Sequence, residues 1–144
     1  MEVVETITAK ETKVTQLEIV EENSKIWKKY LEAKDAKGMR NFYSKNPIFL
    51  PTFSSELITT PEGVEKYFTH FFEINPKVTF QKTSAFYFTS ENSYMQSGMY
   101  DFEVDGPNGT RVVKHARLTF DFIKEKGMWK ILGHHSSALP EKNH

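Results

Sequence analysis

The second half of the chain alternates between apolar and polar side chains, and this constrains the fold more than any other feature. Four segments follow the pattern: 78–89, 93–105, 111–124 and 129–138. A strand points successive side chains to opposite faces, so a two-residue period indicates strands with two distinct faces. The connections, such as Lys126-Gly127, are short and rich in turn residues. The pattern therefore predicts a four-stranded antiparallel meander.

The first half of the chain predicts helices. Apolar residues recur at three- and four-residue steps over 11–34, and a second short helix is expected over 37–43. A short extra strand over 48–50 precedes Pro51, and a further helix starts at Thr59, where Thr59 and Glu62 form a candidate capping box. Helices followed by strands are typical of an α+β domain.

Length and composition limit the organisation and the partners. The 144 residues predict a flexible N-terminal tail over 1–10, a single domain over 11–140 and a C-terminal tail over 141–144. Lys plus Arg and Asp plus Glu both number 19, which argues against nucleic-acid and membrane partners. The chain has no cysteine and no recognisable signal peptide, so we expect a soluble, cytoplasmic protein.

Aromatic residues are frequent, with twelve Phe, six Tyr and two Trp. Each buries a large area, so this composition favours a strongly curved sheet with interior space, or a sheet with one face covered by a partner.

Hairpin geometry assigns the polar residues to faces. If Lys126-Gly127 forms a two-residue loop, Arg117 lies opposite Ser136. If the 106–109 loop pairs Asp105 with Thr110, one face becomes an aromatic wall with convergent polar groups, which is typical of a ligand pocket. The polar candidates on that wall are Tyr100, His115, Arg117 and His134.

Ligand binding is the predicted role of this face. Arg117 is the principal candidate because a buried guanidinium needs a carboxylate or a ligand. Its alternative roles are an internal salt bridge to Asp101 or Glu103, or simple exposure. Tyr43 and Tyr67 are candidates for the pocket mouth.

Catalysis and metal binding are weaker interpretations. His115 and His134 titrate near neutrality and could act as acid or base, but a lone sheet histidine is more often structural. Only these two histidines share the predicted face, whereas a metal site needs about three ligands, so neither a metal nor a cofactor is expected.

The opposite face is also apolar, although an antiparallel sheet usually needs only one apolar face. We therefore expect a second subunit to cover it. The candidate interface residues are Phe120, Phe122, Trp129, Ile131 and His135.

Several sequence pieces resemble a known family, the nuclear transport factor 2-like (NTF2-like, or SnoaL-like) cone fold. The resemblance is to the association, or hub, domain of calcium/calmodulin-dependent protein kinase II and its free-standing relatives. It rests on Lys34-Asp35, Asn46-Pro47, Glu62-Gly63-Val64, Ala116–Phe120, and Gly127–Ile131 followed by His134–Ser137.

The resemblance implies a homo-oligomer, either a dimer or a ring of dimers, assembled through the outer sheet face. It also implies a pocket between the sheet and the long helix, which in the kinase hub contains arginines and can hold small carboxylates. Arg117 matches one such arginine, whereas Ser136 stands at the position of another. No kinase motif is present, so we expect no kinase activity.

Two alternatives remain open at this stage. The first is a small-molecule enzyme on the same cone, an isomerase, hydratase or cyclase acting on a hydrophobic substrate, which requires a carboxylate in the pocket. The second is a module that binds a small carboxylate through Arg117.

Overall fold

The structure, a computed structural model, describes residues 8–81 and 85–140. Three helices precede most of the sheet: α1 (Ala9–Glu32), α2 (Ala36–Phe42) and α3 (Pro61–Phe71). Two short 3-10 turns are η1 (Phe72–Ile74) and η2 (Pro107–Gly109). The strands are β1 (Tyr43–Leu50), β2 (Lys77–Phe80), β3 (Ala85–Ser90), β4 (Ser93–Asp105), β5 (Arg111–Glu125) and β6 (Met128–Ala138).

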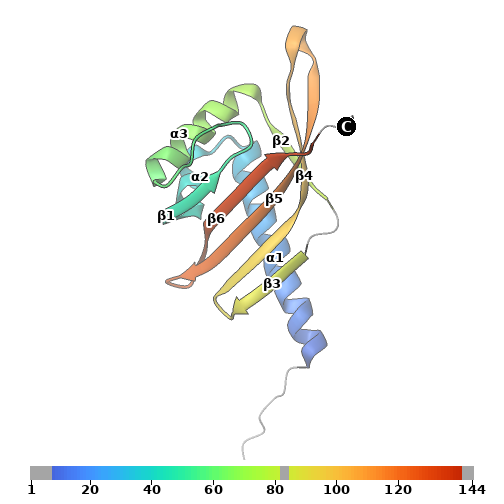
Figure 1. Cartoon of the computed structure of the whole chain (residues 1–144). Coiled ribbons are helices and arrows are strands. Elements are labelled where there is room, and N and C mark those ends of the chain that lie inside the picture. Colours follow the sequence, from blue (N-terminus) through green and yellow to red (C-terminus); the bar gives the residue numbers. More distant parts are fainter. Residues whose placement is uncertain (1–7, 82–84, 141–144) are drawn as a thin grey trace, which may run out of the picture.

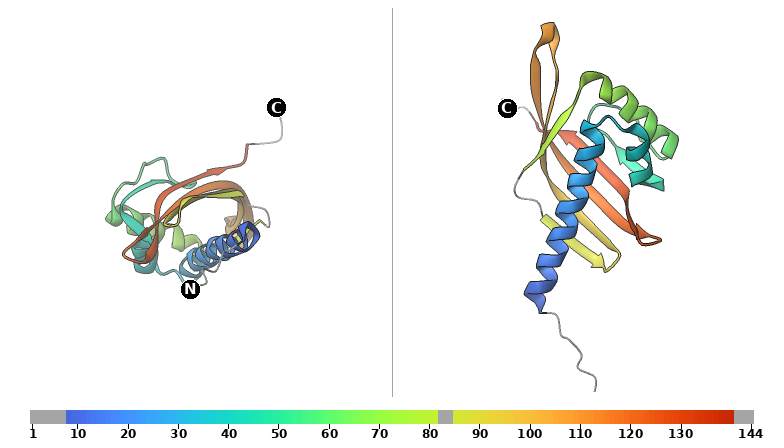
Figure 2. Two further views of the ribbon diagram at one scale, coloured as in Figure 1. Left: turned by 90° about the horizontal axis from the view of Figure 1, so that it is seen from below. Right: turned by 180° about the vertical axis from the view of Figure 1, so that it is seen from behind.

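The six strands form one mixed sheet in the order β1-β6-β5-β4-β2, with β3 also paired to β4. The sheet curls around α1, and all three helices lie on its concave side (Figures 1 and 2). The β4–β5 hairpin projects beyond the body of the domain (Figure 1). No helix of the described residues lies on the convex side of the sheet, so the outward side chains there are open to solvent or to a partner.

The predicted α+β fold with N-terminal helices is confirmed, with three differences. β1 is longer than expected and pairs with β6 in parallel, which makes the sheet mixed. The segment predicted as one strand over 78–89 is divided into β2 and β3. Helix α1 begins at Ala9, inside the predicted N-terminal tail, because Thr8 and Glu11 form a capping box. The predictions for residues 1–7 and 141–144 lie outside the described residues.

The cap of α3 is Thr60, one residue later than predicted. Its hydroxyl accepts a hydrogen bond from the Gly63 amide at 3.0 Å, and Pro61 then occupies the first turn. We expect Thr60→Ala to lower the free energy of unfolding by about 1 kcal/mol. Thr59→Ala should leave it unchanged in the same urea titration. A larger loss in the Thr59 variant would contradict this assignment.

The β4–β5 hairpin has a different register from the predicted one. Asp105 pairs with Arg111, and the intervening loop contains Asn108 and Gly109 with positive φ angles of 58° and 73°. Since a one-residue shift exchanges the faces of a strand, the predicted faces of β5 are wrong. His115 lies opposite Asp101, not Tyr100.

The β5–β6 hairpin begins as predicted, but a bulge then changes its register. Lys126 and Gly127 form the tight turn with φ angles of 50° and 78°. Further along, Phe122 pairs with Ile131 while Asp121 pairs with Gly133, so Leu132 is the extra residue of a β-bulge. As a result, Arg117 lies opposite Ser137 rather than Ser136.

The core fills the space between the helices and the concave face. It contains Phe120, Phe122 and Ile131, each 0–1% exposed. Their predicted role as interface residues is therefore wrong, because they are buried within their own subunit. Trp129 is half-buried and packs 5.2 Å from Tyr94 between ring centroids, whereas His135 is exposed on the outer face.

Candidate functional site

The inward candidates form a buried polar chain centred on His134, which is 3% exposed. The Tyr43 hydroxyl lies 2.8 Å from His134 Nδ1, and the Tyr100 hydroxyl lies 3.1 Å from Nε2. Trp27 Nε1 donates to the Tyr43 hydroxyl at 3.1 Å. Tyr100 donates onward to Ser136, which also contacts the hydroxyl of Thr52.

This chain of hydrogen bonds fixes the tautomer of His134. Tyr43 already accepts from Trp27, so its own proton is directed to Nδ1. Nε2 must then carry the ring proton and donate to Tyr100, whose proton goes to Ser136. Every polar group of the chain is thus satisfied with a neutral imidazole.

Burial keeps the network uncharged. It lowers the pKa of His134 from 6.5 to about 3, with a smaller contribution from the neighbouring His135. Burial also raises the pKa of Tyr43 and Tyr100 well above the usual value for tyrosine. None of these three groups exchanges protons near neutrality, so the network is suited to holding the fold together rather than to acid–base chemistry.

The space beside this network is almost completely filled. The enclosed cavity next to His134 and Tyr67 measures about 10 Å³, roughly the volume that one water molecule requires. The predicted pocket residues Tyr43, Tyr67, Tyr100 and His134 do meet in the interior, but as packed aromatic side chains. They leave no room for a substrate.

The other two ligand candidates, His115 and Arg117, lie on the outer face of the sheet. They border an open groove of about 1010 Å³ between β4, β5 and β6. The prediction that they share a pocket with Tyr100 and His134 is therefore wrong, and the five-residue β4–β5 connection is the physical reason. The inward position of His134 and the outward position of His135 agree with the sequence prediction.

His115 and Arg117 each make one side-chain hydrogen bond in the groove. His115 Nδ1 lies 2.6 Å from Asp101 Oδ1, and Arg117 Nε donates to Ser137 Oγ at 3.3 Å. Neither salt bridge considered for Arg117 forms, because Asp101 faces His115 and Glu103 pairs with Arg111 at 3.2 Å.

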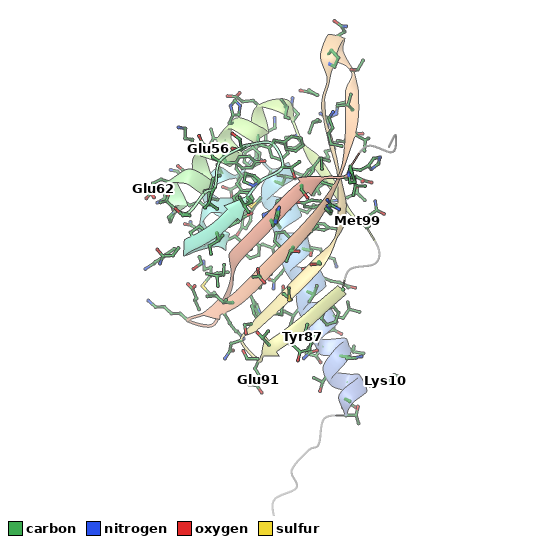
Figure 3. All side chains as sticks on the ribbon, viewed as in Figure 1. Lys10, Glu56, Glu62, Tyr87, Glu91 and Met99 are labelled. Atoms are coloured by element: carbon green, nitrogen blue, oxygen red, sulfur yellow. The ribbon has the colours of Figure 1, made fainter. Side chains whose placement is uncertain are left out.

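Large apolar side chains are exposed on the same face. Tyr87 on β3 and Met99 on β4, both labelled in Figure 3, are 69% and 50% exposed. Met95 on β4 lies opposite Tyr87 and is 43% exposed. On β1, at the opposite edge of the sheet beyond β6, Ile48 and Leu50 also point outward. These five residues are called the outer apolar set below.

A second opening lies between α1 and the sheet. This cleft measures about 440 Å³ and reaches Gln96, which is 3% exposed. Gln96 Nε2 donates to Ser24 Oγ at 3.1 Å, while Oε1 has no hydrogen-bond partner among the described residues. Sequence reasoning did not single out Gln96 as a site residue. Its signal in the sequence is a long amide side chain on a strand that also carries Tyr94, Tyr100 and Phe102.

Within residues 8–81 and 85–140, no three His, Asp or Glu side chains lie close enough together to hold a metal ion. No helix in this part of the chain is both long and apolar enough to cross a bilayer.

Comparisons with known proteins agree with this fold. A protein from Xanthomonas campestris, described under the name of the calcium/calmodulin dependent protein kinase II association domain, is 27% identical over 97% of this chain and 95% of its own, with a TM-score of 0.77. An NTF2-like superfamily protein from Salmonella enterica is 14% identical, covering 92% and 96%, with a TM-score of 0.75.

A Novosphingobium aromaticivorans protein named for scytalone dehydratase has a TM-score of 0.79 at 9% identity, over 94% and 92% of the two chains. At such low identity, the last two similarities show the fold alone. No curated protein sequence matches the chain significantly.

A family model gives the assignment. The model of the calcium/calmodulin dependent protein kinase II association domain matches residues 16–140, which include α2, α3 and all six strands. The resemblance predicted from the sequence is therefore confirmed. The chain belongs to the calcium/calmodulin dependent protein kinase II association domain family, within the NTF2-like fold.

Proposed function

We propose that this chain is a homo-oligomeric association domain whose subunits meet through the outer face of the sheet. The observation that carries the proposal is the outer apolar set, of which Met99 borders the open groove. The set lies on the sheet face that no helix of the described residues covers. An antiparallel sheet that faces solvent normally carries polar side chains there. Exposed apolar groups beside a groove are typical of a surface that a protein partner covers.

Two charged side chains on β5 support a twofold contact. Arg117 and Asp121 both point outward, with Thr119 midway between them. Among the described residues neither forms a salt bridge, and partial burial raises the pKa of the Asp121 carboxyl. In a twofold interface the same patch faces itself. An axis near Thr119 would place Arg117 of each subunit opposite Asp121 of the other.

The test is a charge exchange measured by light scattering. The wild-type chain should form dimers or a larger closed oligomer. Arg117→Asp and Asp121→Arg should each yield monomers, because like charges would meet across the interface. The double variant should restore assembly, since it exchanges the charges and keeps their complementarity.

The control is Lys66→Asp, which makes the same charge change on the exposed surface of α3 and should leave the mass unchanged. A monomeric wild-type chain at high concentration would contradict self-association itself. A double variant that remains monomeric would contradict the twofold pairing of these two residues.

The second part of the proposal is a small-molecule site in the cleft between α1 and the sheet. A volume of about 440 Å³ lies within the range of ligand pockets. The enzyme alternative lacks a comparable observation. It required a carboxylate inside the cone, whereas Asp101 and Glu103 both lie outside it.

A further inference from the structure

Apolar side chains line the inner part of the cleft between α1 and the sheet. Val20 and Leu118 are 1% and 4% exposed at its inner end, and Leu17 is 41% exposed at its mouth. Phe80 on β2 adds further apolar surface. Such a lining favours a ligand with a hydrocarbon body.

Gln96 supplies the polar contact at the inner end. Its amide has one partner, the Ser24 hydroxyl, and its other end has none among the described residues. Turning the amide of Gln96 by 180° would pair Oε1 with the Ser24 hydroxyl and leave Nε2 without a partner instead. Either orientation leaves one of the two amide atoms unsatisfied. A buried amide with an unsatisfied end is rare in folded proteins, and a bound molecule is one of the few explanations.

The charged side chains of the cleft are one glutamate and two lysines. Glu21, Lys25 and Lys28 line the cleft. Lys28 is already engaged, since its Nζ donates to the Val78 carbonyl at 2.8 Å and lies 3.8 Å from Glu32. Among the described residues, an acidic ligand would therefore find no arginine in the cleft and no free cation at its inner end, where the neutral Gln96 lies.

We propose that this cleft binds an uncharged amphipathic molecule, whose hydroxyl or primary amide pairs with Gln96 while its hydrocarbon body packs on Val20, Phe80 and Leu118. Hydroxyl and amide groups both donate and accept, so they satisfy Gln96 in either amide orientation. The inference rests on the proposed ligand cleft and specifies its chemistry. It does not depend on self-association.

The test compares three six-carbon probes: 1-hexanol, hexanamide and hexanoate. Binding is followed at pH 7 by calorimetry and by the NMR signal of the Gln96 side-chain amide. The two neutral probes should bind saturably and shift that signal, and hexanoate should bind at least about tenfold more weakly. Gln96→Met keeps the length and packing of the side chain, and it should weaken hexanamide about tenfold.

Three further variants separate blocking of the cleft from changes elsewhere in the protein. Leu17→Trp fills the mouth from an exposed position and should block both neutral probes even if Gln96→Met is poorly folded. Thr52→Val changes the enclosed cavity beside His134 and should leave binding unchanged. Arg117→Asp, which tests assembly, should also bind normally, so failure of assembly and failure of the ligand proposal give different results.

Two outcomes would overturn the proposal. One is stronger binding of hexanoate than of hexanamide, which would identify an anion site. The other is no saturable binding of either neutral probe, with the Gln96 amide in contact with water alone.

Discussion

Replacing Trp27 by alanine should lower the free energy of unfolding by about 3–5 kcal/mol. Its indole is 1% exposed and lies within about 6 Å, between ring centroids, of six other rings. The substitution would leave a large cavity at the centre of the core and remove the donor to Tyr43. Since domains of this size are stable by only about 5–15 kcal/mol, much of the stability would be lost.

Urea unfolding followed by circular dichroism provides the measurement, and the second tryptophan provides a matched control. Trp129 is half-buried and packs against Phe88, Tyr94 and Lys124 near the β5–β6 turn. Trp129→Ala should therefore cost less than half as much. Trp27→Phe retains much of the packing and isolates the cost of the lost hydrogen bond. Equal losses in the two alanine variants would contradict the central role of Trp27.

Stability should also fall steeply in mild acid because of His134. In the unfolded chain this histidine binds a proton near its ordinary pKa of 6.5, whereas in the folded protein its pKa is about 3. Between these values the unfolded state binds more protons than the folded state. The stabilisation is therefore fully present above pH 6.5 and is lost as the pH falls toward 3, at up to about 1.4 kcal/mol per pH unit.

Two neighbouring substitutions separate this effect from the titration of carboxylates. His134→Gln keeps a donor and an acceptor between Tyr43 and Tyr100 but cannot be protonated. Its unfolding free energy should change less between pH 6 and pH 4 than that of the wild-type protein. His135→Gln, on the exposed side, should retain the full wild-type slope. Parallel pH profiles for wild type and His134→Gln would show that His134 does not cause the acid sensitivity.

The order and type of the elements could be predicted from the chain. The three-residue and four-residue spacing of apolar groups gave α1 and α3, and the two-residue alternation gave β4, β5 and β6. The parallel pairing of β1 with β6 could not be predicted in this way. It joins segments more than 80 residues apart, and no local pattern encodes such a contact.

The candidate site was predicted only in part. Tyr43, Tyr100 and His134 were assigned to the interior, where the structure brings them together. That they fill the space instead of lining a pocket follows from three-dimensional packing, which spacing along the chain does not contain. The unpaired end of Gln96 is likewise visible only when every neighbour of the amide is in place.

The sequence by itself determined the α+β fold, the family and the alternation within each strand. Only the tertiary structure decided which face of β5 is inside, and hence that Arg117 and His115 lie outside while Phe120 and Phe122 form the core. The physical reason is parity. The β4–β5 connection contains one residue more than predicted, which exchanges the inward and outward faces of β5. The bulge at Leu132 adds one residue to β6 and shifts its pairing with β5 in the same way. The best side-chain packing selects between these registers, and packing is a property of the whole fold.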